Sequence, residues 1–503
     1  MVEGVRRKRR ARHRKSAALL AAVGFMILGL ASCENKKDSG PPPRKTYTLT
    51  VTRTEGIEGS PAAGTTQYDP GAAVNYDYHA NEDFSDLAIT LDGAAIASAG
   101  SFTMDKDRTL AAFCVKRVLW KFDTTSSVYY SCPAVGDDGT VYFGTGMSSM
   151  MPGTLYALTS SGAIKWSYNA GAALYSPVIG PDGTVYVQDA RDVVYALSPA
   201  GALKWYYNDY ESFYFRDVGQ RNPAIGADGT LYVASDGLYA LDPATGRRLW
   251  HFTHPRYPDR DCRASPVIGQ DGTIYVVIGE DTLFAVSPAG SMRWVFAFDN
   301  EWEMSFTSPA IDQNGVIYLA TEGKPGGGDY SMVYAINPNG SLKWKYPVEG
   351  GRFVRASPTV AADGSIYIAT KSPGTDRPAK LIKLSPAGQW LWDYTIERVH
   401  ETPDDSYSSP SVGADSLVYF GAETGYLYVM NPNGTLSWKF KLRDAINWSS
   451  PAITSDGTLY IGAMCGPNYG GRLYAVKTAS LGYAATPWPR FRHDRKNTGR
   501  YGS

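Results

Sequence analysis

The sequence predicts an all-β protein, an eight-bladed β-propeller preceded by a small β-rich domain. Of the 503 residues, 43% are apolar and only 19% are charged, while 52 Gly, 31 Pro and 35 Tyr exceed ordinary usage. This balance favours strands joined by turns. From Trp120 onward, one pattern recurs at intervals of 41 to 52 residues, the period of propeller blades. A separate region of alternating residues precedes these repeats.

The N-terminus carries an export signal. Eight basic residues between Arg6 and Lys15 precede an apolar stretch over 17–30, which is short for a bilayer span but typical of a signal sequence. The stretch ends in Leu-Ala-Ser-Cys at Cys33. This run resembles a bacterial lipobox, and the resemblance implies cleavage before Cys33 and attachment of acyl chains to it, which anchor a protein stably in a membrane. The alternative is an ordinary secretory signal with a chance cysteine.

The expected domain boundaries follow these changes of composition. We expect a lipoprotein signal peptide over 1–32, a Pro-rich tether over 33–45, a β domain over 46–116 and the propeller over 117–503. Beyond residue 15, 41 basic residues face 48 acidic ones, a net charge of about −7. This charge argues against nucleic acid as a partner.

The region 46–116 shows its own strand pattern. Alternating residues occur over 47–51 and 73–78, an Asp92-Gly93 turn follows a third apolar run, and a last strand pattern ends near Phe113. The order of these segments resembles one divergent internalin B-type repeat, a spacer found in bacterial surface proteins. The resemblance implies a stalk that lifts the propeller off the membrane.

Each propeller repeat begins with a proline, which is tolerated at the first residue of a strand. The eight prolines are Pro133, Pro177, Pro223, Pro266, Pro309, Pro358, Pro410 and Pro451. An Asp-Gly turn follows in most copies, because Gly permits the positive φ of a tight hairpin. Copies five and seven depart from it with Asn314-Gly315 and Asp415-Ser416. A Tyr recurs in the second strand of every copy.

A Gly four residues before a Trp marks the outer strand in seven of the eight copies. The missing outer strand is expected at Leu119 to Phe122, which would complete the last blade from the N-terminal side and leave few exposed sheet edges. The alternative is that closure lies in the run from Trp488 to Phe491. The recurring Trp and Tyr residues are interpreted as packing between blades rather than as a binding site.

The segment from Ala240 to Trp250 matches A-x-D-x-x-T-G-x-x-x-W, the tryptophan-docking motif of pyrroloquinoline-quinone (PQQ)-like propellers. The chain thus resembles this repeat family over about three quarters of its length. It is similar in architecture to BamB, a lipoprotein of the outer-membrane barrel-assembly machinery, although the inserted 46–116 domain departs from that architecture. The resemblance implies the fold more directly than the function.

The sequence offers no catalytic or metal constellation. PQQ-dependent alcohol dehydrogenases, the enzymatic relatives in this repeat family, carry adjacent disulfide-bonded cysteines and a calcium ion. The five cysteines of this chain include no adjacent pair and no zinc spacing; they are Cys33, Cys114, Cys132, Cys262 and Cys465. We therefore expect no enzyme activity, no cofactor and no metal.

One face of the propeller is expected to bind a partner. The connections between blades, and those between second and third strands, vary widely and emerge on the same face. They are rich in aromatic and Arg side chains, the composition of a recognition surface. The candidate binding residues are Tyr210, Phe213, Tyr214, Arg216, Arg256, Tyr257, Trp302 and Trp448. The alternative is that some of these aromatics fill the centre of the ring.

These observations predict a lipid-anchored, non-enzymatic scaffold of the bacterial cell envelope, with the outer membrane preferred. Its expected partner is an envelope protein or polysaccharide, and a role in outer-membrane protein assembly is one form of this hypothesis. The alternative is a quinoprotein oxidoreductase with an altered site. Cys132 and Cys465 are predicted to lie where the ring closes, so a disulfide between them could reinforce that junction. Buried free thiols are the alternative, as is a bridge from Cys114 to Cys132.

Overall fold

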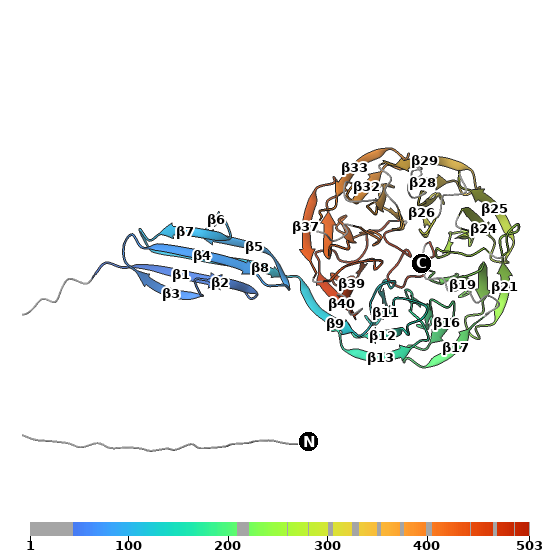
Figure 1. Cartoon of the computed structure of the whole chain (residues 1–503), viewed down its shortest axis with the longest axis horizontal. Coiled ribbons are helices and arrows are strands. Elements are labelled where there is room, and N and C mark those ends of the chain that lie inside the picture. The colour runs from blue at the N-terminus through green and yellow to red at the C-terminus, as the bar shows by residue number, and fades with distance from the viewer. Residues whose placement is uncertain are drawn as a thin grey trace, which may run out of the picture.

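The protein is described here by a computed structural model, in which the named elements of the described residues are all β-strands. The strands form a ring, with a second, elongated unit beside it (Figure 1). The predicted all-β propeller is confirmed. Within the described ranges, no helix is long and apolar enough to cross a membrane. The structure describes residues 44–208, 221–258, 260–279, 281–299, 305–323, 331–349, 354–372, 377–398, 405–442, 444–465, 470–486 and 488–501.

The first eight strands form the elongated unit. One sheet has the order β3-β1-β8-β5-β6, in which β1 and β8 are parallel, and a second has the order β2-β4-β7. Leu49, Tyr78 and Met104 are buried in the core of this unit. Its resemblance to an internalin repeat stays a prediction. The strands are β1 Tyr47–Arg53, β2 Ile57–Ser60, β3 Gly64–Tyr68, β4 Ala73–Ala80, β5 Phe84–Leu91, β6 Ala94–Ile96, β7 Ala99–Thr103 and β8 Arg108–Lys116.

The ring contains eight four-stranded antiparallel sheets among the described residues, one for each sequence copy. The first four blades comprise β10 Ala134–Val135, β11 Val141–Gly144, β12 Thr154–Leu158 and β13 Ile164–Asn169; β14 Val178–Ile179, β15 Val185–Gln188, β16 Val194–Leu197 and β17 Leu203–Tyr207; β18 Ala224–Ile225, β19 Leu231–Ala234, β20 Leu238–Leu241 and β21 Arg248–Phe252; and β22 Val267–Ile268, β23 Ile274–Val277, β24 Thr282–Val286 and β25 Met292–Ala297.

The remaining blades repeat this arrangement, except that blade 8 takes its outer strand from the beginning of the propeller. They comprise β26 Ala310–Ile311, β27 Ile317–Ala320, β28 Ser331–Ile336 and β29 Leu342–Val348; β30 Thr359–Val360, β31 Ile366–Ala369, β32 Lys380–Leu384 and β33 Trp390–Thr395; β34 Ser411–Val412, β35 Val418–Gly421, β36 Tyr426–Met430 and β37 Leu436–Lys441; and β38 Ala452–Ile453, β39 Thr458–Cys465, β40 Gly470–Lys477 and β9 Val118–Thr124.

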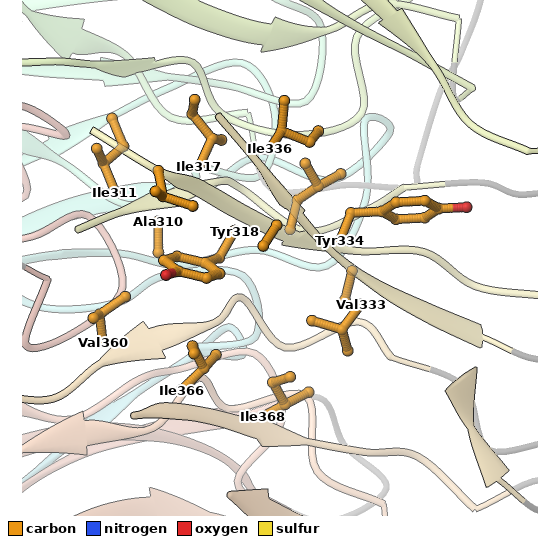
Figure 2. Packing of buried hydrophobic residues seen from close by; sticks show 14 of the residues in the cluster. Ala310, Ile311, Ile317, Tyr318, Val333, Tyr334, Ile336, Val360, Ile366 and Ile368 are labelled. Atoms are coloured by element: carbon orange, nitrogen blue, oxygen red, sulfur yellow. The ribbon is translucent and has the colours of Figure 1, made fainter. Parts of the chain in front are cut away.

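The core lies between neighbouring blades. Figure 2 shows the fully buried ring of Tyr318, from β27, between the strands of blade 5 and Val360 and Ile366 of the next blade. Its hydroxyl donates to Asp312, 3.0 Å away. The recurring Tyr therefore fills the space between two sheets and still satisfies its polar end, as a buried Tyr must.

Seven seams between blades share one docking contact at the rim. The indole of Trp294 donates to the carbonyl of Pro338 in the next blade, 2.8 Å away, and its ring covers Gly340. Gly340 has a φ of +86°, and a Cβ there would lie 2.8 Å from the indole, so both conformation and space require Gly. The other six indole donors are Trp120, Trp166, Trp205, Trp250, Trp344 and Trp392.

The eighth seam, between blades 7 and 8, lacks this contact. Blade 8 has no turn between its third and fourth strands, because β40 and β9 come from opposite ends of the propeller sequence. The guanidinium of Arg117 instead lies over the ring of Trp438, 4.1 Å from its centroid. Arg117 is held by Asp86 and by Ser85 of the elongated unit. The unit therefore meets the ring at the seam that lacks a docking turn.

A closed belt of hydrogen bonds surrounds the axis. The residue before each repeat proline accepts, through its side chain, the backbone N–H of the equivalent residue in the preceding blade, over 2.6 to 3.1 Å. Blade 8 returns to blade 1, because the N–H of Ser450 donates to the sulfur of Cys132. The eight members are Cys132, Ser176, Asn222, Ser265, Ser308, Ser357, Ser409 and Ser450.

Of the alternatives for Cys132 and Cys465, the structure has free thiols rather than a disulfide. Both are free thiols, as is Cys114. The sulfur of Cys132 belongs to the belt and also lies 3.4 Å from the carbonyl oxygen of Trp448. Cys465 is at the far end of β39, where it pairs with Gly470 across the hairpin. The two cysteines therefore have different neighbours, although both lie at the closure of the ring.

The first propeller strand closes the ring at the rim, as predicted. Strand β9 pairs antiparallel with β40, from Val118 opposite Val476 to Thr124 opposite Gly471. Trp120 of β9 packs against Tyr460 of blade 8 and docks on blade 1. One strand thus completes blade 8 and joins it to its neighbour.

The C-terminal segment closes the ring a second time, at its axis. The C-terminus lies at the centre of the ring in Figure 1. Between Trp488 and Gly499, six backbone carbonyls accept N–H groups from inner strands of blades 1, 2, 3, 4, 6 and 7, over 2.7 to 3.0 Å. The hydroxyl of Tyr483 accepts the N–H of Ile453 in blade 8. We call residues 483–501 the axial segment.

Candidate functional site

The two ends of the ring axis differ. The axial segment lies at the end nearest the Asp-Gly turns, where Arg495 and Lys496 bind the side chain of Asp137. At the opposite end, the inner strands begin after the variable connections. On this side, seven described residues stand two positions before a belt member in the sequence. The described members of this set, the loop-side ring, are Tyr130, Leu174, Arg263, Phe306, Arg355, Tyr407 and Trp448.

One part of the loop-side ring is aromatic. Trp448 stacks on Tyr407, with centroids 4.9 Å apart and planes inclined by 25°. Tyr130 lies on the other side of Trp448, at 6.4 Å, and also contacts Tyr129 and Tyr175. Trp448 is only 5% exposed. These rings form a continuous, largely buried aromatic cluster from blade 7 to blade 1.

The adjoining part combines a Phe with two Arg residues. The ring of Phe306 lies between the guanidinium groups of Arg263 and Arg355, at 5.4 and 4.9 Å from its centroid. The Nε of Arg355 donates to both carboxylate oxygens of Glu322, which is 4% exposed. This ion pair fixes Arg355 in place, so the loop-side ring presents positioned cations beside its aromatic surface.

Further charges lie beside Tyr407. Lys371 donates to its hydroxyl at 2.6 Å and pairs with Asp405 at 3.5 Å. Burial first, and then the negative charge of Glu423, raise the pKa values of Tyr407 and Tyr129. Both phenols therefore stay neutral near pH 7 and serve as hydrogen-bonding groups rather than as bases.

The structure brings only some of the predicted binding residues together. Trp448 belongs to the loop-side ring. Its side chain is buried, in agreement with the alternative that some of these aromatics fill the centre of the propeller. Arg256 and Tyr257 lie elsewhere, in the connection between blades 3 and 4, where the guanidinium groups of Arg256 and Arg260 stand over the Tyr257 ring at 5.3 and 4.7 Å. Tyr257 is 42% exposed. Cys33, Tyr210, Phe213, Tyr214, Arg216 and Trp302 lie outside the described residues.

Sequence reasoning missed most of the loop-side ring. Arg263, Phe306, Arg355 and Tyr407 all stand three residues before a repeat proline. Aligning the eight copies on that proline would have placed these side chains at one level of the axis. The type of residue at this position changes from blade to blade, which separates it from the invariant packing positions.

The residues do not fit the cofactor of the quinoprotein alternative. The described cysteines are in the elongated unit, in the belt, before blade 4 and in blade 8, so no adjacent pair exists to cover a quinone. Within the described ranges, no cluster of three His, Cys, Asp or Glu side chains could hold a metal ion. The loop-side ring therefore combines aromatic rings, cations and paired carboxylates.

Comparison with protein families supports this fold assignment at the sequence level. The profile of a family described as outer membrane protein assembly factor BamB matches residues 106–251 and 234–431. Together the two matches run from β8, the last strand of the elongated unit, to β36 of blade 7.

Solved structures show the same fold. BamB from Moraxella catarrhalis is 15% identical with a TM-score of 0.51, and the alignment covers 71% of this chain and 96% of that one. The C-terminal WD40 domain of Sif2 gives a TM-score of 0.52 at 11% identity, covering 71% and 97%. The Dos1 propeller gives 0.51 at 13% identity, covering 71% and 95%. At these identities the likeness concerns the fold alone.

One curated relative is an enzyme. Tetrathionate hydrolase of Acidithiobacillus ferrooxidans is 27% identical over 258 residues. The match spans about half of each protein, 48% of this chain and 48% of the relative.

Proposed function

Because the chain belongs to the family described as outer membrane protein assembly factor BamB, we propose that it is a non-enzymatic, protein-binding scaffold of the bacterial cell envelope. The loop-side face of the propeller takes the partner, and a role in assembling outer-membrane proteins is the form of this proposal that the family favours. The loop-side ring carries the proposal, because its aromatic and Arg side chains have the composition of protein-binding hot spots.

Exposed side chains around the ring support a protein partner. Met150 and Met151, in the connection between β11 and β12, are 73% and 45% exposed. Tyr257 adds an exposed aromatic between two Arg residues on the same face. Flexible Met side chains adapt to apolar partner surfaces. A buried aromatic and cationic centre with apolar side chains around it suits a protein better than a polysaccharide.

Site-specific photocrosslinking tests the proposal. A photoreactive amino acid at Met150 or Tyr257, in the full-length chain within bacterial envelopes, should give discrete crosslinks to an envelope protein. The matched control is Ala200, an exposed residue in the turn between β16 and β17 on the opposite face. Equal crosslinking from Ala200, or none from the loop-side positions, would contradict the proposed face.

Membrane anchoring is the second part of the proposal and rests on the lipobox resemblance at Cys33. We expect Cys33→Ala to abolish acylation and to move the protein from the detergent phase to the aqueous phase in phase partitioning. Cys114→Ala is the matched control, because Cys114 is another free thiol and its loss leaves the lipobox intact. Unchanged partitioning of Cys33→Ala would remove the anchor from the proposal.

A second candidate function is hydrolysis of tetrathionate, which the 27% identical relative favours. Two cations of the loop-side ring, Arg263 and Arg355, and the neighbouring Lys371 would face such a dianion. Purified protein incubated with tetrathionate should then consume it, as measured by ion chromatography, and Arg263→Gln should slow consumption. Absence of consumption under conditions in which the hydrolase itself is active would eliminate this candidate.

A further inference from the structure

Two guanidinium groups lie fully inside the ring. Arg490 is 0% exposed and Arg492 is 1% exposed, and both belong to the axial segment. Arg492 donates from Nη1 to the carbonyl of Pro266, 2.6 Å away, and from Nη2 to the carbonyl of Pro223. Arg490 donates one long hydrogen bond, 3.5 Å from Nη1 to the carbonyl of Asp494, and its guanidinium also interacts with Tyr483. Among the described residues, the hydrogen-bond acceptors of the two guanidinium groups are therefore neutral carbonyl oxygens.

Several polar atoms of this interior have no hydrogen-bond partner among the described residues. They are Nε and Nη2 of Arg490, Nε of Arg492 and Oδ1 of Asn497. Asn497 is also fully buried and donates its amide to the carbonyls of Cys132 and Pro177. An unpaired buried donor costs about 1 to 3 kcal/mol, and more when the donor is charged.

The nearest carboxylate is already engaged. Asp494 accepts the backbone N–H groups of Lys496 and Thr498 at 2.9 and 3.0 Å, and the hydroxyl of Thr498. It attracts Arg492, but burial outweighs that attraction and lowers the pKa of Arg492 to about 9. The one carboxylate that attracts Arg492 is thus already occupied by other donors.

Other buried or half-buried Arg residues of the ring are paired differently. Arg221 is 1% exposed, and its Nη1 lies 3.0 Å from Asp192. Arg355 binds Glu322 through Nε. This fold therefore supplies a carboxylate to Arg residues elsewhere in its interior, whereas Arg490 and Arg492 have none within ion-pair distance in the part of the chain that the structure describes.

The two unpaired nitrogens of Arg490 indicate which kind of ligand would satisfy them. Nε and Nη2 form one edge of the guanidinium plane, with two parallel N–H bonds that match two oxygens of an oxyanion. Tyr483 contributes the adjoining wall, since Arg490 lies 5.5 Å from its ring centroid and its hydroxyl oxygen accepts the N–H of Ile453. We propose that the interior of the propeller binds a small inorganic oxyanion on the Nε/Nη2 edge of Arg490, beside Arg492. This site is separate from the loop-side ring and independent of the proposed function.

The oxyanion would tie the axial segment to the blades. It would neutralise the surplus positive charge and satisfy the two donors of Arg490 at once. Because such a ligand binds the folded protein alone, it raises the stability as its concentration exceeds its dissociation constant. The dependence is saturable, in contrast to the general effect of kosmotropic salts.

Selenate, an anomalously scattering analogue of sulfate, is the probe. Crystals of the wild-type protein soaked in selenate should show an anomalous peak within hydrogen-bond distance of Nε and Nη2 of Arg490. In solution at constant ionic strength, selenate should raise the unfolding temperature with a saturable profile. Water alone at this position, together with a non-saturable profile, would overturn the proposal.

Two matched variants assign the effect. Arg490→Met keeps the approximate side-chain length and removes the donors, so the saturable rise should disappear. Arg495→Met removes a cation of the same segment that pairs with Asp137 at the surface, so the rise should persist. Loss of the rise in both variants would mean that general charge causes it, and would also overturn the site. The wild-type crystal decides the question even if Arg490→Met does not fold.

Discussion

The propeller is closed twice, at the rim by its first strand and at the axis by its last segment. At the rim, β9 makes a continuous antiparallel ladder with β40, and its contacts concern two neighbouring blades. At the axis, the segment from Trp488 to Gly499 makes single hydrogen bonds to inner strands of six blades. The rim closure is thus strong and local, whereas the axial closure is weaker at each point and spread around the ring.

This difference separates two tasks. The strand β9 prevents an exposed sheet edge, which would otherwise invite pairing with another chain. The axial segment has a different role, because it satisfies inner-edge N–H groups that no strand of the same blade can reach. Loss of β9 should open one seam. Loss of the axial segment should loosen many inner strands without opening the ring.

The largest effect is expected from removing β9. A chain that begins after Thr124 lacks the outer strand of blade 8 and the docking Trp120, so we expect loss of cooperative thermal unfolding and a tendency to aggregate. The control chain begins at Arg117 and loses only the elongated unit. Its unfolding temperature, measured by calorimetry, should stay close to that of the full propeller. Similar behaviour of the two chains would place the closure elsewhere.

A smaller effect is expected from removing the axial segment. A chain that ends at Thr486 loses the six carbonyl acceptors, at about 0.5 to 1.5 kcal/mol each. We expect a decrease of about 3 to 9 kcal/mol in the free energy of unfolding, with the far-ultraviolet circular dichroism of the strands retained. A decrease as large as that caused by loss of β9 would show that the axis, rather than the rim, holds the ring.

Two tryptophans allow a docked seam to be compared with the seam between blades 7 and 8, which lacks the docking contact. Trp294→Ala removes an indole that donates to Pro338 and covers Gly340, and should cost about 3 kcal/mol. Trp438 is half-buried like Trp294 but has Arg117 in place of a turn, so Trp438→Ala should cost about 1 to 2 kcal/mol. Urea unfolding of both variants measures the difference, and equal costs would contradict the distinction between the seams.

The smallest effect is expected in the belt. Cys132→Ser keeps an acceptor for the N–H of Ser450 and restores the group that most blades use, so the change should lie within about 0.5 kcal/mol. Cys132→Val has similar volume but leaves that N–H unpaired, and should cost about 1 to 3 kcal/mol. Chemical denaturation distinguishes them. A neutral Cys132→Val would mean that the belt contributes little at this position.

The rim of the molecule could be predicted from the sequence, whereas the axis could not. Recurring Pro, Tyr, Gly and Trp residues show the blade pattern because each performs the same local task in every copy. The missing eighth Gly-Trp pair then predicted β9, as the pairing of β9 with β40 confirms. The belt was missed because a Ser before Pro looks like an ordinary turn residue. The axial segment occurs once, so no repeat revealed it.

The candidate site was harder to predict for a related reason. Binding residues differ from blade to blade, so they carry no repeat signal, and aromatic character alone did not separate Tyr257 at the surface from Trp448 in the interior. The sequence left a disulfide and free thiols as alternatives, because it placed Cys132 and Cys465 on the same side of the closure but could not give the direction of each side chain. Belt membership of Cys132 follows only from three-dimensional register.

The pairing of β9 with β40 also constrains the order in which the protein can fold during synthesis. Strand β9 is made before any blade of the ring, yet its partner β40 is made near the end of the chain. Blades 1 to 7 can assemble in sequence as they emerge, but blade 8 cannot form until almost the whole chain is available. The ring therefore remains an open arc for nearly all of translation. Such an arc needs protection of its two terminal edges until the last residues arrive.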